Sequence, residues 1–256
     1  MRLGKQANTG SAGTVAIIPA LNEAGSIGAV LCDLPRASLA RTIVVDNGSR
    51  DATAAIAARH GAEVVYEPRR GYGFACMAGV AAAPEASLYL FLDGDYSDYP
   101  DEAGALVAPI LAGRADVVLG TRMLRPEARA ALPPAARAGN RLASRLIRAR
   151  YDVRVTDLAP FKAVSGDALR RLALQERTYG WTIELIVRAV QQRLRIQEVP
   201  VRYRRRLAGE SKVSGNLPGT LRASARILTT LARLEAQQIA LIQRSRVPLD
   251  QREACR

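Results

Sequence analysis

The chain has 256 residues, of which 48% are hydrophobic and 24% charged, and its formal net charge at pH 7 is +13. This length suits one large domain with its own core and is short for two complete domains. The charge predicts a polyanionic partner, which can be nucleic acid, an anionic membrane face or a phosphorylated substrate. Because only 5% of the residues are aromatic and no nucleic-acid-binding module is recognisable, no nucleic acid is expected, and such a protein stays a third alternative.

Three widely spaced cysteines, Cys32, Cys76 and Cys255, do not form a disulfide framework. A reduced, cytoplasmic protein is the simplest interpretation. The first residues lack the apolar core of a signal peptide. No run of 18 apolar residues occurs that would span a membrane. We therefore expect a cytoplasmic protein, and a peripheral position on the cytoplasmic face of the membrane stays open.

The first 120 residues alternate apolar strands with helical patterns. Strands are expected at 14–19, 42–46, 63–66, 88–93 and 115–120, and helices at 26–34, 51–59, 73–82 and 102–111. Strands without polar alternation, separated by helices, predict a mostly parallel sheet that is covered on both faces. Ligands bind such a sheet beyond the carboxyl ends of its strands. Polar residues gather at three of these ends, at 19–23, 46–51 and 93–98.

The second half of the chain is less regular. Residues 121–137 contain three prolines and are expected to form an irregular basic loop. The elements expected after it are helices at 138–150, 167–174 and 182–192, a strand at 195–203, a mobile basic loop at 202–215 and a helix at 217–244. We divide the chain into a flexible N-terminus (1–13), a main domain (14–215) and an amphipathic helical tail (216–256).

Two carboxylates, Asp93 and Asp95, follow the buried strand at 88–93, in the sequence LFLDGD. Mg²⁺ is usually held by one or two carboxylates together with substrate phosphates. Such a cation neutralises the negative charge that develops on a departing diphosphate. The pattern therefore predicts a metal-assisted site, although a solvated acidic turn has the same sequence.

Other strand ends carry polar groups of the same kind. In VVDNGSRDAT, Asp46 can accept hydrogen bonds from a base or ribose, whereas Ser49 and Asp51 can cap the next helix. For Asp51 we prefer the capping role. The sequence PALNE at 19–23 points toward the same crevice, and RRGYG at 69–73 is a basic turn suited to a phosphate or base.

These motifs resemble a known family of enzymes. In the order IIPALNEAGSI, IVVDNGSRDAT, EPRRGYGFA, LFLDGDYSD and VVLGTRM, they are similar to the inverting glycosyltransferases that include dolichol-phosphate mannose synthase and bacterial polyprenyl-phosphate glycosyltransferases. The resemblance covers residues 14–215. It implies an α/β, Rossmann-like GT-A fold with a mostly parallel central sheet, a nucleoside-diphosphate sugar as donor, and Mg²⁺ or Mn²⁺ as cofactor.

The resemblance also implies roles for residues on the donor side. Asp95 is expected to bind the metal, with Ser97 as a weaker ligand where dolichol-phosphate mannose synthases carry a glutamine. The basic loop resembles the family's R-x-x-G-x-S-K segment and is expected to close over the diphosphate. The side chains expected to hold the donor are Pro19, Asn22, Glu23, Asp46, Arg70, Asp93, Arg206 and Lys212.

On the acceptor side, the sequence Gly-Thr-Arg at 120–122 resembles a Gly-Ser-Arg of the polyprenyl-phosphate enzymes. Arginine suits a phosphate because it offers two parallel donors. Solvated surface charges are the alternative. Glu184 stands where the family often places an acidic residue, which can be a general base or can orient cations, and Asp157 is a similar candidate. The residues expected to meet the acceptor phosphate are Arg122, Arg137, Asn140 and Arg141.

The predicted function is inverting transfer of a hexose from a nucleoside-diphosphate sugar to a polyprenyl phosphate. The second pKa of a phosphate ester is about 6, so this acceptor is already anionic and needs no strong base. His60, the single histidine, is interpreted as a helix-end cation. The tail helix at 217–244 lies in a membrane interface or packs on the main domain. A soluble acceptor, or a binding protein that has lost catalysis, are the alternatives.

Overall fold

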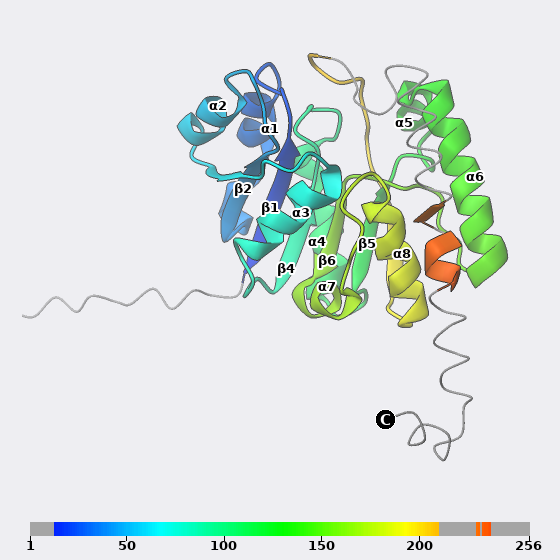
Figure 1. Ribbon diagram of the computed structural model, residues 1–256. Helices are drawn as coiled ribbons and strands as arrows, with labels where there is room; N and C mark the ends of the chain where they lie inside the picture. Colours follow the sequence, from blue (N-terminus) through cyan, green and yellow to red (C-terminus); the bar gives the residue numbers. More distant parts are fainter. Residues whose placement is uncertain (1–12, 210–228, 231, 237–256) are drawn as a thin grey trace, which may run out of the picture.

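Strands and helices alternate along the chain, as the sequence predicts. The computed structural model describes residues 13–209, 229–230 and 232–236. Within this part, seven strands form one sheet (Figure 1). The strands are β1 (Thr14–Ala20), β2 (Arg41–Asp46), β3 (Glu63–Tyr66), β4 (Leu88–Phe91), β5 (Val117–Thr121), β6 (Lys162–Ser165) and β7 (Ile196–Pro200).

The strand order is β3-β2-β1-β4-β6-β5-β7. Neighbouring strands run parallel except at β6, which is antiparallel to both β4 and β5. The expected mostly parallel sheet is therefore confirmed. Strand β6 was not expected, because four residues that include a lysine carry no strand pattern. Its pairing on both sides comes from tertiary contacts.

Helices cover both faces of the sheet. Helices α1 (Ile27–Asp33), α2 (Thr53–Arg59) and α4 (Ala103–Leu111) pack on one face. The opposite face is covered by α3 (Tyr72–Ala81), α6 (Pro134–Tyr151), α7 (Gly166–Leu172) and α8 (Trp181–Gln191). The remaining helical segments are η1 (Arg36–Ser38), η2 (Pro100–Glu102) and α5 (Pro126–Ala131).

Two apolar cores result from this arrangement. Successive side chains of a strand point to opposite faces of its sheet, so Ile17 belongs to the core under α3 and Ile18 to the core under α1. Both side chains are fully buried. This double burial explains why the central strands are continuous apolar runs without polar alternation.

The segment expected to be an irregular loop at 121–137 is more ordered than its sequence suggests. Strand β5 extends to Thr121, α5 occupies 126–131, and α6 begins at Pro134 instead of residue 138. Both helices carry proline at their first position, where its fixed φ and missing N–H are tolerated. Three prolines thus mark two helix starts, and the expectation of a loop was wrong here.

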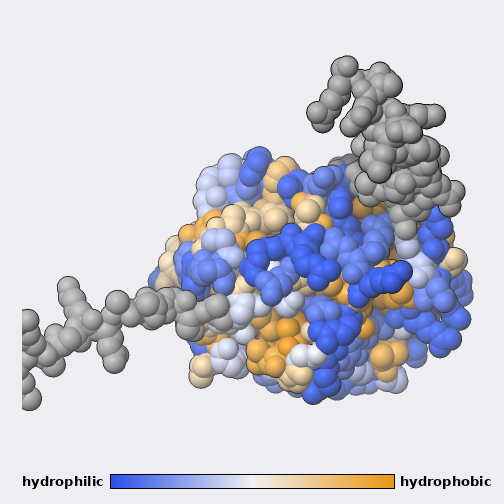
Figure 2. Space-filling view, turned by 90° about the horizontal axis from the view of Figure 1, so that it is seen from below, coloured by the Kyte–Doolittle hydropathy of each residue, from blue (hydrophilic) through white to orange (hydrophobic). Residues whose placement is uncertain are grey.

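Several sequence predictions fall on residues outside the described part. These are the N-terminus except residue 13, Lys212, and the tail helix apart from residues 229–230 and 232–236, which are helical. No helix of the described residues is long and apolar enough to cross a membrane. Figure 2 shows the end of the molecule away from the carboxyl ends of the parallel strands; its described surface is largely hydrophilic, with apolar residues in separate areas.

Candidate active site

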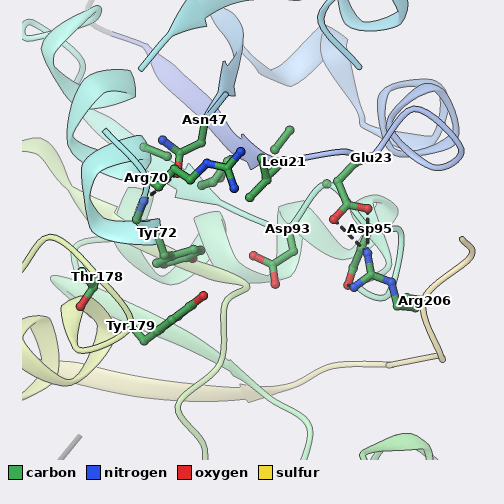
Figure 3. A pocket seen from close by; sticks show the side chains of 15 residues that line it. Leu21, Glu23, Asn47, Arg70, Tyr72, Asp93, Asp95, Thr178, Tyr179 and Arg206 are labelled. Atoms are coloured by element: carbon green, nitrogen blue, oxygen red, sulfur yellow. Dashed lines mark hydrogen bonds and ion pairs between the residues drawn. The ribbon is translucent and has the colours of Figure 1, made fainter. Parts of the chain in front are cut away.

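A pocket of about 380 Å³ opens where β1, β2 and β4 end (Figure 3). These three strands are neighbours and run parallel, so their carboxyl ends meet at one edge of the sheet. The turn before α3 and a segment before α8 complete the walls. Its polar and aromatic lining consists of Glu23, Asn47, Arg70, Tyr72, Asp93, Asp95, Thr178, Tyr179 and Arg206.

Three carboxylates crowd the end of β4. Burial, and then repulsion from Asp95 and Asp98, raise the pKa of Asp93 well above its ordinary value. Burial likewise raises the pKa of Asp98 to about 7. Its Oδ1 atom is buried and has no hydrogen-bond partner among the described residues. Burial and the neighbouring carboxylates therefore disfavour the ionised forms of Asp93 and Asp98, a cost that a cation beside them would reduce.

This donor set fits a divalent cation that is shared with a substrate. The described residues contain no group of three His, Cys, Asp or Glu side chains that could enclose a metal by themselves. Mg²⁺ usually needs only one or two carboxylates when substrate phosphates supply further oxygens. Asp95 and Asp93 line the pocket and meet that requirement.

Ser97 has a different place from the expected one. It does not line the pocket, and its side chain is buried beside Tyr203. Its backbone N–H donates to Asp95 Oδ1 at 2.9 Å. Ser97 thus orients the carboxylate, and the structure does not bring its hydroxyl to the pocket.

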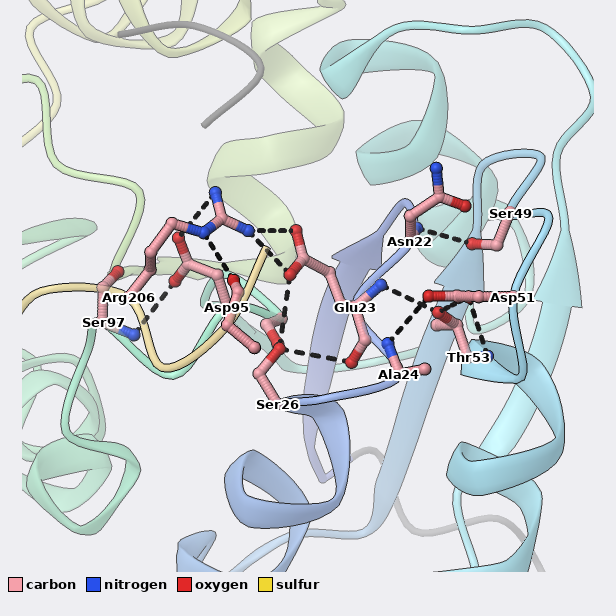
Figure 4. Close-up of polar contacts among 12 residues, drawn as sticks. Asn22, Glu23, Ala24, Ser26, Ser49, Asp51, Thr53, Asp95, Ser97 and Arg206 are labelled. Atoms are coloured by element: carbon pink, nitrogen blue, oxygen red, sulfur yellow. Dashed lines mark hydrogen bonds and ion pairs between the residues drawn. The ribbon is translucent and has the colours of Figure 1, made fainter. Parts of the chain in front are cut away.

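Arg206 closes one side of the pocket (Figure 4). Its Nη2 atom lies 2.9 and 2.8 Å from the two carboxylate oxygens of Glu23, and its Nη1 atom lies 3.7 Å from Asp95 Oδ2. The next residue, Leu207, donates its backbone N–H to the Asp95 carbonyl at 3.1 Å. Arg206 and Leu207, at the described start of the basic loop, therefore contact the acidic edge of the pocket.

Asn22 and Asp46, which were expected to bind the donor, do not line the pocket. They stabilise the turns beside it. Asn22 has a φ of 53°, and its Oδ1 accepts the Arg50 N–H at 2.8 Å. Asp46 is 7% exposed and accepts the Ser49 N–H at 2.8 Å. Asp51, as preferred from the sequence, has a structural role, because it accepts the N–H of Thr53 in the first turn of α2.

Asn47 links the turns after β2 and β3. Its Nδ2 donates to the carbonyls of Glu67 and Arg69, both at 2.9 Å, and its Oδ1 accepts the Gly71 N–H at 2.8 Å. In the structure it fixes the loop that carries Arg70 into the pocket.

Sequence reasoning missed the aromatic wall of the pocket. Tyr72 of α3 and Tyr179 of the segment before α8 lie next to one another across the pocket from Arg206, and Thr178 lies beside Tyr179 (Figure 3). The segment before α8 reaches the pocket because Phe74 donates its N–H to the Arg177 carbonyl at 2.9 Å. No sequence signal joins residues that lie more than a hundred positions apart.

A buried cation lies behind this wall. Lys162 of β6 is 0% exposed, and its Nζ lies 3.0 Å from Thr182 Oγ1 and 3.5 Å from the Tyr72 hydroxyl. Its Nζ also lies 5.3 Å from the centre of the Trp181 ring, within cation–π range. Burial lowers the pKa of Lys162 to about 8. No pattern in the sequence selects this lysine.

The family model for Glycosyl transferase family 2 matches residues 15–178. The chain belongs to glycosyl transferase family 2. An uncharacterized glycosyltransferase of Mycobacterium tuberculosis (strain H37Rv) is 43% identical over 212 residues, which cover 83% of this chain and 94% of the relative. The dolichyl-phosphate hexose transferase of Haloferax volcanii is 34% identical over 197 residues, covering 75% and 82% of the two chains. The undecaprenyl-phosphate mannosyltransferase of Micrococcus luteus is 29% identical, covering 79% and 88%.

Solved structures have the same fold. The crystal structure of glucosyl-3-phosphoglycerate synthase from Mycobacterium tuberculosis, in complex with Mn²⁺, uridine diphosphate and glucosyl-3-phosphoglycerate, matches with a TM-score of 0.70. The two proteins are 25% identical, and the match covers 86% of this chain and 78% of the other. The suspected family and the GT-A fold are both confirmed.

In this glycosyltransferase, Arg122 differs from the expected loop arginine. It is buried, and its Nε and Nη2 lie 2.7 and 2.8 Å from the two carboxylate oxygens of Asp157. The guanidinium also lies 4.9 Å from the centre of the Tyr203 ring. Asn140 of α6 donates to the same carboxylate. The expectation of a poorly ordered position was wrong, because the ion pair is part of the packed interior beside the pocket.

The other acceptor-side residues are not brought together by the structure. Arg137 is half-buried on α6, and Arg141 is exposed on a groove away from the donor pocket. Glu184 is fully buried, and its Oε2 accepts the backbone N–H groups of Gln175 and Glu176. It thus supports the segment that carries Thr178 and Tyr179 and does not line the pocket.

Proposed function

We propose that this family 2 glycosyltransferase moves a hexose from a nucleoside-diphosphate sugar to a polyprenyl phosphate, with a divalent cation in the donor site. The observation that carries the proposal is that Asp93, Asp95, Arg70 and Arg206 line the same pocket. Carboxylates suit a metal-bridged diphosphate, and arginines suit its remaining oxygens. Relatives named as dolichyl-phosphate and undecaprenyl-phosphate transferases support the lipid acceptor.

On the donor side, Pro19, Arg70 and Tyr72 line the pocket and would form the wall for the nucleotide, and Asp93 and Asp95 would hold Mg²⁺ or Mn²⁺. When bound, the cation supplies charge neutralisation for the departing diphosphate. Arg206, now paired with Glu23, exchanges this partner for a diphosphate oxygen.

On the acceptor side, a phosphate oxygen of the lipid attacks the anomeric carbon from the face opposite the diphosphate. The new C–O bond forms as the bond to the diphosphate breaks, so the configuration inverts. The acceptor is anionic near neutral pH and gives up no proton to the protein. This agrees with a described pocket lining that contains no histidine: His60 bonds the Ile56 carbonyl in α2.

A soluble phosphorylated acceptor is the second candidate. Glucosyl-3-phosphoglycerate synthase, whose solved complexes contain phosphoglyceric acid or its glucosylated product, shares the fold over most of both chains. The same donor pocket serves either reaction. The two candidates differ in whether an apolar chain must lie beside the acceptor phosphate.

The test is a panel of nucleotide sugars with three acceptors: polyprenyl phosphate, the free polyprenol and 3-phosphoglycerate. We expect transfer to polyprenyl phosphate that stops in excess chelator and returns with added Mg²⁺ or Mn²⁺. Full activity in chelator contradicts the metal. Equal rates on the phosphate and the alcohol contradict a phosphate acceptor. Preference for 3-phosphoglycerate supports the second candidate.

A further inference from the structure

A second hollow, of about 340 Å³, lies between α6 and the segments at 123–124 and 154–156. It shares no lining residue with the donor pocket. Four arginines line it: Arg141, Arg145 and Arg148 from α6, and Arg154 from the chain that follows. We call this hollow the arginine groove.

Among the described residues, no acidic side chain forms an ion pair with the arginines of the arginine groove. Helix α6 contains five arginines and no acidic residue. Arg150, on another side of the helix, pairs with Glu235. Within the described part of the chain, by contrast, the four groove arginines have no ion pair or side-chain hydrogen bond. Four like charges that share a small space repel one another, and an anion between them removes this cost.

The groove also contains a polar atom without a partner. Ser144 lies on α6 between Arg141 and Arg145 and lines the groove. Its Oγ is buried and makes no hydrogen bond to any described residue. A buried hydroxyl normally has a partner, and a serine hydroxyl can donate to a phosphate oxygen. This second observation points to a ligand with acceptor oxygens.

Exposed leucines stand beside these cations. Leu124, on the groove, is 53% exposed, and Leu142 and Leu146 of α6 are 52% and 37% exposed. Positions 142 and 146 are four residues apart and share one face of the helix, next to the stripe of arginines. Leucines next to arginines are typical of helices that lie in a membrane interface. A freely soluble phosphate compound would leave these leucines in water.

We propose that the arginine groove binds the phosphate headgroup of an anionic membrane phospholipid, while Leu124, Leu142 and Leu146 enter the interface of the bilayer. Helix α6 lies at the edge of the molecule, and α5 beside it stands at the same end as the loop at 204–209 (Figure 1). Docking through the groove holds the enzyme on an anionic bilayer. The proposal does not depend on which acceptor the enzyme uses.

The test measures binding of the full chain to vesicles by flotation. Wild-type protein is expected to float with vesicles that contain phosphatidylglycerol and to stay unbound with pure phosphatidylcholine. Each basic residue near an anionic bilayer contributes about a fivefold factor, so the double variant R141E/R145E is expected to bind at least ~25-fold more weakly. The matched control R59E/R171E makes the same charge change at exposed positions of α2 and α7 and should float like wild type.

Two further variants test the contributions of the Ser144 hydroxyl and of the exposed leucines separately. Ser144→Ala keeps every charge and should bind phosphatidylglycerol vesicles severalfold more weakly, and L142S/L146S should do the same while retaining the salt dependence of binding. Equal flotation of wild type and R141E/R145E overturns the proposal, as does equal loss in R59E/R171E. Binding of inorganic phosphate without vesicle binding also overturns it. Vesicle binding is measured without turnover, so these experiments test membrane docking independently of the proposed transfer reaction.

Discussion

At the scale of single residues, Asp95 is the side chain on which the donor chemistry depends most. Its carboxylate lies at the edge of the pocket, held by the Ser97 N–H and 3.7 Å from Arg206. Asp95→Ala should lower kcat by about 10²–10³ with the fold intact, because charge stabilisation of the leaving diphosphate is lost. Transfer assays together with circular dichroism measure both effects. The control Asp101→Ala removes an exposed carboxylate outside the pocket and should leave turnover unchanged. If turnover is also unchanged in Asp95→Ala, Asp95 has no part in the mechanism.

The Arg122–Asp157 pair gives a second prediction at this scale. Arg122→Ala leaves the fully buried Asp157 carboxylate without its cation, which should lower the free energy of unfolding by about 3–5 kcal/mol. Arg122→Lys should recover only part of this, because an ammonium cannot form the two parallel hydrogen bonds. Urea unfolding measures the effect. The double variant R122M/D157L should lose less than R122A alone if the pair is structural.

The same variants test the acceptor role expected from the sequence. Arg122→Lys retains the positive charge beside Asp157 and is therefore the variant to use for kinetic measurements. A higher KM for polyprenyl phosphate at unchanged nucleotide affinity would support contact with the acceptor phosphate. Equal KM values in wild type and Arg122→Lys would leave Arg122 with its interior ion pair as its role.

At the scale of elements, α3 positions the pocket through its first turn. A Cβ atom on Gly73 would lie 2.7 Å from backbone atoms of Glu176 and Arg177, in the segment that carries Thr178 and Tyr179. Gly73→Ala should therefore push this segment away, lower stability by about 1–3 kcal/mol and weaken nucleotide binding. Calorimetry with the preferred nucleotide and thermal unfolding check both expectations.

Gly139, in the second turn of α6, is the matched control. A Cβ there meets no atom within 4 Å. Gly139→Ala should stabilise the protein by about 0.5–1 kcal/mol, because alanine loses less backbone entropy in a helix. A destabilised Gly139→Ala, or a harmless Gly73→Ala, would contradict the close approach as the reason for glycine at position 73.

At the scale of the whole molecule, Cys76 reports on the integrity of the core. It is 0% exposed between α3 and the sheet, and burial raises the pKa of its thiol to about 12. In native protein at pH 8, Cys76 should resist alkylation, while the exposed Cys32 reacts at once. Peptide mapping after labelling at increasing urea should show Cys76 reacting in step with global unfolding. Rapid labelling of Cys76 without denaturant would contradict this packing.

Much of the molecule was predictable from the order of residues along the chain. Strands β1 and β2 differ from the predicted bounds by one residue each, because strands buried on both faces are apolar along most of their length and end at polar turns. The edge strand β3 has the predicted bounds. The same polar turns indicated Glu23, Asp93 and Asp95, which line the pocket. The order of the motifs along the chain also indicated the family, because five motifs in a fixed order are far more specific than any one of them.

The sequence by itself thus determined the family, the parallel part of the sheet and the acidic edge of the donor pocket. Only the tertiary structure decided the partners of charged side chains. It inserted β6, which carries Lys162, between the consecutive strands β4 and β5, buried Arg122 against Asp157, and made Glu184 an acceptor for backbone N–H groups of the segment before α8. The physical reason is that an ionisable group takes its role from what surrounds it, and these surroundings come from residues far away in the chain.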